Sequence, residues 1–325
     1  MTIGLTYDLR TDYLAEGYSL EETAEFDDES TIEGIEQAIQ KAGHQTERIG
    51  HARHLMARLL KGDTWDMVFN ITEGLYGGGR ESLVPALLDA YRIPYVFSDA
   101  VTMALTLNKA FAKQIVRDAG VNTAAFHVVY REEDIAQIDL VFPLFAKPIS
   151  EGTGKGVDTA SKIETPEELE IVCRRLLKTF NQAVLVEEYL PGREFTVGIL
   201  GTGADAFVAG AMECVFTNGQ DVLLSLENKD IWESIMNLVA VEGDILEACK
   251  DMALKSWRAL NCYDGGRMDA KIDRHGNLSF IEMNPLAGLH PTSSYMPILC
   301  RMNGLSYQKV IETILESATK RHFGI

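Results

Sequence analysis

The chain has 325 residues, more than a single hydrophobic core usually serves, so two or three domains are expected. Its 30 Lys and Arg residues against 48 Asp and Glu residues give a formal net charge of −18, which argues against nucleic acid or an anionic membrane as partner and requires local basic residues around any phosphate ligand. No apolar run is long enough to span a bilayer and no signal sequence precedes the first predicted strand, so we expect a cytoplasmic protein.

Short apolar strands alternate with helical patterns over the first hundred residues. A capping box at Ser30 and a stop at Gly43 bound one predicted helix. The other predicted elements are strands at 2–7, 67–71 and 93–97 and a helix at 83–91. This alternation predicts an α/β sandwich of parallel strands.

The remaining chain is predicted to form two α+β units. Thr165 is expected to begin one helix, and the last third is rich in strands. The other predicted elements are strands at 123–130, 143–148 and 184–189 and helices at 108–119, 244–260 and 306–318. We therefore expect three packed units: an N-terminal α/β domain at 1–105, a central unit at 106–192 and a C-terminal unit at 193–325.

The segment 265–285 has the pattern of a β-hairpin with a four-residue turn. Antiparallel pairing across that turn places Asp269 opposite Glu282 and Arg267 opposite Asn284. Alternation then puts these four polar residues on one face of the hairpin. The opposite face is expected to hold Met268, Ala270, Ile272, Ile281 and Met283.

Two carboxylates and an amide oxygen on one face repel each other unless a cation lies between them. Ligands that are all oxygen suit a hard divalent ion, and Mg²⁺ shared with nucleotide phosphates is the commonest case. The hairpin therefore predicts a metal site. The alternative is a surface hairpin whose charges are solvated, which is common in antiparallel sheets.

A glycine-rich loop follows the predicted strand that ends at Lys147 and Pro148. Gly152 and its neighbours allow backbone N–H groups to approach phosphate oxygens, while Lys147 supplies positive charge. The loop does not match the phosphate loop of nucleotide hydrolases or the dinucleotide fingerprint. Glycines also punctuate ordinary turns, so a plain flexible turn is an equally good interpretation.

Three further segments carry candidate contacts. A carboxylate or backbone carbonyl in 186–194 can accept from an adenine amino group, and Glu194 from ribose hydroxyls; the alternative is a solvated acidic turn. Hydroxyls and N–H groups of 288–294 can receive a substrate carboxylate, or can cap the helix that follows. The loop 77–82 follows a strand at the edge where α/β sheets bind ligands, which makes Glu73, Arg80 and Glu81 candidates, although such residues are more often solvated.

Together these motifs resemble the ATP-grasp ligases and, among them, the D-alanine–D-alanine ligase family. The resemblance runs in order from about residue 67 to the C-terminus. The segments that carry it are Ile93-Pro94-Tyr95, Leu107-Asn108-Lys109, Lys147-Pro148 with Glu151-Gly152-Thr153, the run from Glu187 to Val197, and Arg267-Met268-Asp269 with Glu282-Met283-Asn284-Pro285 and Gly288.

The resemblance implies an ATP-grasp fold, in which an N-terminal parallel α/β domain precedes two α+β domains that clamp ATP. It assigns ATP binding to Lys109, Lys147, Glu151, Gly152, Glu187, Glu188, Leu190 and Glu194. It assigns two Mg²⁺, with Mn²⁺ as a substitute, to Asp269, Glu282 and Asn284, and substrate binding to Glu73, Gly288, Ser293 and Ser294. Catalytic roles fall to Arg267, Thr153 and Lys229.

The activity implied is ligation of two small amino acids. A carboxylate attacks the γ-phosphoryl group, and an amine then attacks the acyl phosphate to form an amide, with release of ADP and phosphate. Arg267 is suited to stabilise the oxyanion of the second step. Homodimers are usual in the resembled family, so a homodimer is one expected assembly.

This sequence departs from the family in the pocket for the first substrate. The family's His-Gly appears as Glu73-Gly74, its Glu-Asp pair as Gly78-Gly79, and its paired serines as Thr153-Gly154. Which acid of the segments 7–10 and 25–30 anchors the first ammonium is open. L-amino acids or non-proteinogenic ones are therefore alternative substrates, a thiol or carrier is an alternative acceptor, and a non-catalytic nucleotide-binding regulator is an alternative of another class.

Overall fold

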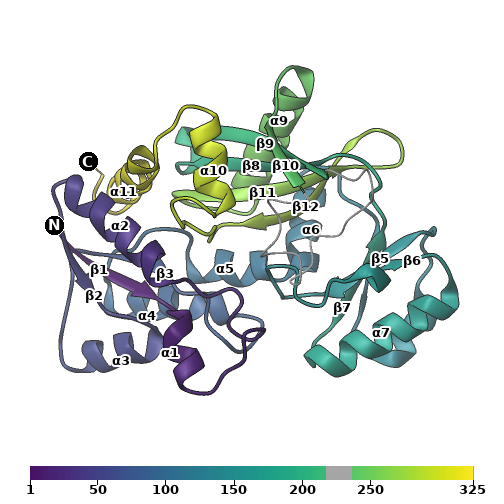
Figure 1. The fold of residues 1–325 in the computed structure, drawn as a ribbon, viewed down its shortest axis with the longest axis horizontal. Helices are drawn as coiled ribbons and strands as arrows, with labels where there is room; N and C mark the ends of the chain where they lie inside the picture. The colour runs from purple at the N-terminus through teal and green to yellow at the C-terminus, as the bar shows by residue number, and fades with distance from the viewer. Residues whose placement is uncertain (217–235, 325) are drawn as a thin grey trace.

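A computed structural model of the chain describes residues 1–216 and 236–324. Three sheets follow one another along the described sequence: a parallel sheet of three strands, an antiparallel sheet of four and an antiparallel sheet of five. Figure 1 shows the five-stranded sheet above the four-stranded one, with the N-terminal sheet beside both. Each sheet lies within one of the three predicted units, whereas helix α5 (Ala100–Leu107) crosses the predicted boundary at 105, which stays a prediction.

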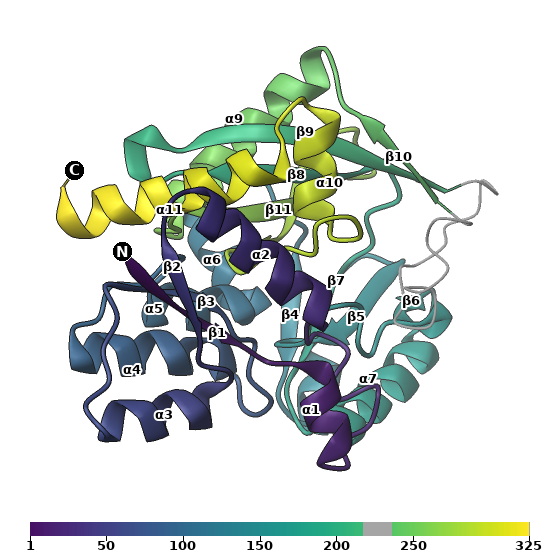
Figure 2. The same ribbon diagram turned by 60° about the vertical axis from the view of Figure 1, so that its left-hand side comes forward.

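The N-terminal sheet has the order β2-β1-β3 and is covered on both faces by helices. One core joins Ile3 and Phe69 to helix α2, and another joins Val68 to helices α3 and α4. Helix α2 also packs against the C-terminal helix α11 (Tyr307–Phe323; Figure 2). The elements are β1 (Thr2–Tyr7), α1 (Arg10–Ala15), α2 (Glu29–Lys41), β2 (Gln45–Arg48), α3 (Ala52–Leu60), β3 (Met67–Ile71), η1 (Arg80–Ser82) and α4 (Leu83–Tyr91).

Two predictions for this unit are wrong. The segment 93–97 is not a strand but makes a single bridge to β3, because Phe97 turns the chain at φ 71° and gives its N–H to the Asp264 carboxylate at 2.8 Å. The N-cap of α2 is Asp28 and not Ser30. The Ser30 hydroxyl is used elsewhere, since it donates to Asp28 at 2.6 Å and lies 2.8 Å from His290 Nε2.

The central unit is an antiparallel sheet of order β4-β7-β5-β6 with helix α7 against one face. Thr165 caps α7 as predicted, with its side chain accepting from the Glu168 N–H. The elements are α6 (Lys109–Asp118), β4 (Phe126–Val129), η2 (Glu132–Gln137), β5 (Leu144–Pro148), η3 (Thr159–Ser161), β6 (Lys162–Ile163), α7 (Pro166–Phe180) and β7 (Val184–Glu188).

The C-terminal sheet has the order β10-β9-β8-β11-β12. Helices α6 and α9 pack on one face around the buried Trp257, and α10 and α11 pack on the other. The elements are β8 (Glu194–Leu200), η4 (Gly203–Asp205), β9 (Phe207–Phe216), β10 (Met236–Ala240), α9 (Asp244–Ala259), β11 (Gly265–Ile272), β12 (Leu278–Asn284), α10 (Tyr295–Met302) and α11 (Tyr307–Phe323). No helix in the described ranges is long and apolar enough to cross a membrane.

The predicted hairpin register is correct at the site and shifted near the turn. Asp269 pairs with Glu282 and Arg267 with Asn284, but Ala270 pairs with Phe280 because a bulge follows Asp269. The extra residue changes the facing on β12, so Phe280 enters the core. Ile281, predicted for the core, instead lines the cavity described below.

Candidate active site

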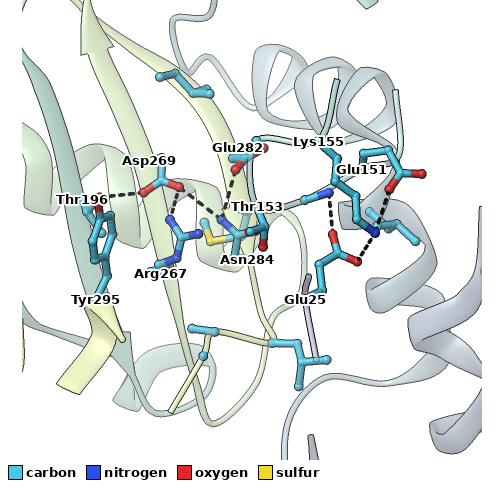
Figure 3. A pocket seen from close by; sticks show the side chains of 18 of the residues that line it. Glu25, Glu151, Thr153, Lys155, Thr196, Arg267, Asp269, Glu282, Asn284 and Tyr295 are labelled. Carbon is cyan, nitrogen blue, oxygen red and sulfur yellow. Dashed lines mark hydrogen bonds and ion pairs between the residues drawn. The ribbon is translucent and has the colours of Figure 1, made fainter. Parts of the chain in front are cut away.

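A cavity of about 760 Å³ is lined by residues of all three units. Strands β11 and β12 form one wall, the glycine-rich loop and β7 form another, and the N-terminal segments around Glu25 and Glu73 close a third. Figure 3 shows the groups around Asp269 and around Glu25 facing this cavity. The cavity thus brings together segments that are far apart in the sequence.

The wall formed by β11 and β12 carries the predicted metal residues on one face. Thr196 Oγ1 donates to Asp269 Oδ1 at 2.8 Å, Asn284 Nδ2 donates to Asp269 Oδ2 at 3.2 Å, and Arg267 pairs with the same carboxylate. Burial raises the pKa of Asp269, Arg267 opposes the shift and Glu282 adds to it. The positive charge near Asp269 therefore does not fully offset the cost of burying its ionised carboxylate.

Glu282, in contrast, lies among cations. Its Oε2 is 3.1 Å from Lys109 Nζ, and Asn284 Nδ2 lies 3.5 Å from Oε1. Burial alone would raise the pKa of Glu282, but Lys109, Lys147 and Arg267 outweigh burial and hold it at about 2. This carboxylate is ionised at every physiological pH.

Two lysines share the Glu187 carboxylate. Lys147 Nζ lies 2.8 Å from Oε1, and Lys113 Nζ lies 2.8 Å from Oε2. These cations outweigh burial and hold the pKa of Glu187 at about 2. Both oxygens face a lysine, so the predicted contact of Glu187 with adenine would need one of them to turn away. Sequence reasoning missed Lys113, although it lies four residues after Lys109 on α6 and thus on the same helix face.

The glycine-rich loop lies over these lysines. Lys109 Nζ donates to the Glu151 carbonyl oxygen at 2.6 Å, and the Gly152 N–H donates to Glu25 Oε1 at 2.7 Å. Thr153 has a φ of 53°, which is unusual for a β-branched residue. A strained residue in a loop that lines a cavity is consistent with the predicted catalytic role.

The side of the cavity that holds the segment 186–194 has an apolar wall and a polar rim. Phe145, Tyr189, Leu190, Ile281 and Met283 line it. Lys271 Nζ lies 3.2 Å from Glu194 Oε2, while Arg274 lies 3.8 Å from the Glu188 carboxylate. An apolar wall with polar groups at its edge is the form of site that takes a purine ring.

The loop 288–294 closes the opposite end, and Gly288, Ser293 and Ser294 line the cavity as expected. Ser294 is the N-cap residue of α10, but its side chain caps no helix amide and accepts instead from the His290 N–H at 3.0 Å. Ser294 thus occupies the predicted N-cap position, but its side chain does not supply the capping hydrogen bond.

The N-terminal wall is acidic. Glu25 lies 3.0 Å from Arg80 and 3.7 Å from Lys155. Glu73, Glu81 and Asp27 line the same cavity and form no ion pair within residues 1–216 and 236–324. Burial raises the pKa of Glu81 and of Asp27 to about 7, and burial with the nearby Glu81 and Glu25 raises that of Glu73.

The structure therefore brings together most predicted site residues and adds several. Lys229, predicted to face phosphate, lies outside the described residues. Glu25 and Asp27 of the candidate run 25–30 line the cavity, and the additional residues around it are Lys113, Lys155, Thr196 and Lys271. Helical spacing could have identified Lys113, and strand alternation from Asp269 could have identified Lys271. The others depend on contacts between distant segments.

Solved structures of similar fold cover nearly the whole chain. D-alanine–D-alanine ligase from Bacillus anthracis complexed with ATP superposes with a TM-score of 0.73, 19% identity and coverage of 99% of this chain and 98% of that one. The VanG D-Ala:D-Ser ligase from Enterococcus faecalis gives a TM-score of 0.75, 17% identity and coverage of 98% and 99%. The fold is thus the ATP-grasp fold.

Sequence comparison places the chain more narrowly. The family model described as D-ala D-ala ligase C-terminus matches residues 115–316. The uncharacterized protein y4sG of Sinorhizobium fredii is 30% identical over 298 residues, covering 88% of this chain and 87% of that protein. D-alanine–D-alanine ligase of Aquifex aeolicus is 28% identical over 293 residues, covering 88% and 93%. The chain belongs to the D-alanine–D-alanine ligase family.

Proposed function

We propose that the protein is an ATP-dependent ligase that joins the carboxylate of one amino acid to the amine of another through an acyl phosphate. The observation that carries this proposal is the wall of Asp269, Glu282 and Asn284 beside Lys109 and Lys147, because oxygen ligands next to lysines suit a metal-bound triphosphate. The ATP-bound relative of the same fold supports the nucleotide assignment.

The donor chemistry of this wall fits Mg²⁺. The carboxylates of Asp269 and Glu282 are hard ligands, and a half-turn of the Asn284 amide would present Oδ1 where Nδ2 now lies. We assign two Mg²⁺ to these three residues, and Mn²⁺ has the same ligand preference. When bound, the ions neutralise charge on the phosphate oxygens.

The lysines and the segment 186–194 would orient the nucleotide. Lys109 and Lys147 are buried at the cavity wall, so their charges would act on the phosphates with little screening. The backbone around Glu188 and Leu190 would hold adenine, and Glu194 the ribose. We propose that Glu187 acts mainly by fixing Lys147, since both its oxygens already face lysines.

The proposed ligation proceeds in two steps. A carboxylate oxygen of the first substrate forms a bond to the γ-phosphorus while the bond to the ADP oxygen breaks. The neutral amine of the second substrate then attacks the acyl carbon, phosphate leaves with the bonding electrons, and the amine loses a proton to give the amide. Arg267 can stabilise the oxyanion between these events, and exclusion of water from the cavity would limit hydrolysis of the acyl phosphate.

Two substrate sets compete within this proposal. D-alanine is the reference because relatives with that name match the chain. L-amino acids or non-proteinogenic amino acids form the second set, since Glu73 stands at the pocket where the family has His. A non-catalytic regulator is disfavoured, because nucleotide binding alone does not require both Asp269 and Glu282.

A screen of phosphate release tests the proposal. Purified protein with MgATP should release phosphate with at least one pair of amino acids, drawn from a panel in both stereochemical forms, and mass spectrometry should find the dipeptide. Neither member alone should give the same rate. Binding of MgATP without phosphate release for any pair would contradict ligase activity and favour a regulator.

A further inference from the structure

The acids of the N-terminal wall differ in what holds them. Glu25 is fully engaged, because Arg80, Lys155 and the Gly152 N–H surround its carboxylate. Asp8 is 2% exposed and accepts from Tyr13 at 2.5 Å and from the Gly74 N–H at 2.8 Å. Both residues therefore stabilise the wall and need no ligand.

Within the described residues, Glu73 and Glu81 form no ion pair and no side-chain hydrogen bond, whereas Asp27 accepts a hydrogen bond from the Thr31 hydroxyl. Glu73 follows β3 at the C-terminal edge of the parallel sheet. The Gly74 N–H donates to the Asp8 carboxylate, and this hydrogen bond fixes the loop that bears Glu73. Glu81 lies on η1, near enough to Lys109 and Glu282 to interact electrostatically with both. Glu81 is thus close to the phosphate end of the cavity.

The two arginines nearest these acids act on them electrostatically but make their hydrogen bonds elsewhere. Arg80 donates to the Ser150 carbonyl oxygen at 2.7 Å and pairs with Glu25. Arg10 donates to three backbone carbonyls of the segment 23–26, at 2.8 to 3.2 Å. Among the described residues neither arginine forms an ion pair with Glu73, Glu81 or Asp27, so these carboxylates can still accept hydrogen bonds from a ligand.

A metal ion is a poor candidate for that ligand. Among the described residues, no group of three or more His, Cys, Asp or Glu side chains converges closely enough to hold one. The three acids come from separate segments along the wall. Carboxylates that are spread in this way suit an extended ligand with cationic groups at more than one place.

We infer that the first substrate is a diamino carboxylic acid, whose second ammonium group binds at Glu73 and Glu81. An ordinary amino acid brings one ammonium and would leave at least one of the three carboxylates without a cation. This inference rests on the proposed ligase function, because the substrate carboxylate must face the phosphate end.

Protonation supports the inference. Burial raises the pKa of Glu81 to about 7 and that of Glu73 well above its ordinary value, so the empty pocket can lower its charge by holding protons. A bound ammonium would replace those protons. Binding of the cationic substrate should then strengthen as pH rises through 7.

The test compares each diamino acid with a neutral isostere. Lysine is paired with norleucine, ornithine with norvaline and 2,4-diaminobutyrate with 2-aminobutyrate, in both stereochemical forms and with the acceptor panel used above. We expect kcat/KM for phosphate release to favour at least one diamino acid over its isostere by tenfold or more. The product should contain the diamino acid as the residue that gave its carboxyl group.

Variants connect the preference to the acids. Glu73→Gln and Glu81→Gln should each lower that kcat/KM ratio at least tenfold, whereas Glu33→Gln, an exposed residue of α2 outside the cavity, should leave it unchanged. Thermal melts confirm folding of each variant. Neutral pairs that turn over with a ratio below ten, or a ratio unchanged in both variants, would overturn this inference alone; no turnover with any pair contradicts the ligase function itself.

Discussion

The two acidic walls of the cavity use the same side chains in opposite states. On β12, cations outweigh burial and hold the pKa of Glu282 at about 2. On η1, burial prevails and the pKa of Glu81 is about 7. The number of fixed cations, and not burial, therefore decides which wall is permanently charged. One wall is prepared for a metal-bound anion, and the other for a cation.

Loss of the permanent charge should have the largest effect. Glu282→Gln keeps the shape of the side chain but removes the charge beside Lys109, so we expect kcat/KM for phosphate release to fall by about 10³-fold or more. Asp269→Asn should behave similarly. Circular dichroism and melting curves check that the variants fold, and near-normal activity in both would contradict the metal assignment.

The lysine pair around Glu187 should matter next, through stability. Lys113 is wholly buried, and Lys113→Met would remove one of two cations from a buried carboxylate, costing about 3 kcal/mol of unfolding free energy. Urea unfolding measures this change. The control is Lys309→Met on α11, where an exposed ion pair should contribute about 0.5 kcal/mol or less. Equal losses would argue against a structural role for Lys113.

The N-terminal wall should lower the free energy of unfolding as pH rises. Because the folded pKa of Glu81 lies above its ordinary value of 4.5, its proton stabilises the folded state below about pH 4.5, and this contribution is lost as pH rises through 7. Glu81→Gln has no proton to lose. We expect the ligand-free variant to gain about 2 kcal/mol relative to the native chain between pH 5 and pH 8. Parallel profiles of melting temperature against pH would contradict the raised pKa.

The hydroxyl that supports Asp269 should give the smallest effect. Thr196→Val removes the 2.8 Å hydrogen bond to Oδ1 with little change in shape, so we expect about tenfold weaker activation by Mg²⁺. Thr196→Ser keeps the hydroxyl and serves as the matched control. Titration of phosphate release with Mg²⁺ measures both variants, and identical curves would remove Thr196 from the site.

Local patterns predicted much of this fold because they depend on neighbours in the sequence. The strand at β3, the cap at Thr165 and the pairing of Asp269 with Glu282 all follow from alternation or capping chemistry. The predicted pairing of β11 with β12 is wrong beyond Asp269, because a bulge has no clear signal in a single sequence. The strand predicted at 93–97 is wrong because the Phe97 N–H donates to Asp264, a residue far away in the chain.

The site was predictable on one wall only. Its metal residues lie on a single hairpin, so spacing alone brings them together. The opposite wall combines Glu25, Glu73 and the loop at Gly152, and their contacts depend on packing between units. Which acids keep a partner and which do not is likewise a property of the folded chain. Sequence reasoning could therefore name Glu73 but not the burial that raises its pKa.

Transfer of oxygen from the substrate carboxylate to phosphate distinguishes an acyl phosphate from attack of water on ATP. The most active pair from the phosphate-release screen is supplied with ¹⁸O in the carboxyl group of the first amino acid, and the released phosphate is examined by mass spectrometry. An acyl phosphate predicts one ¹⁸O atom from that carboxyl group in each phosphate. Phosphate that carries no label, with its new oxygen drawn from water, would contradict the account.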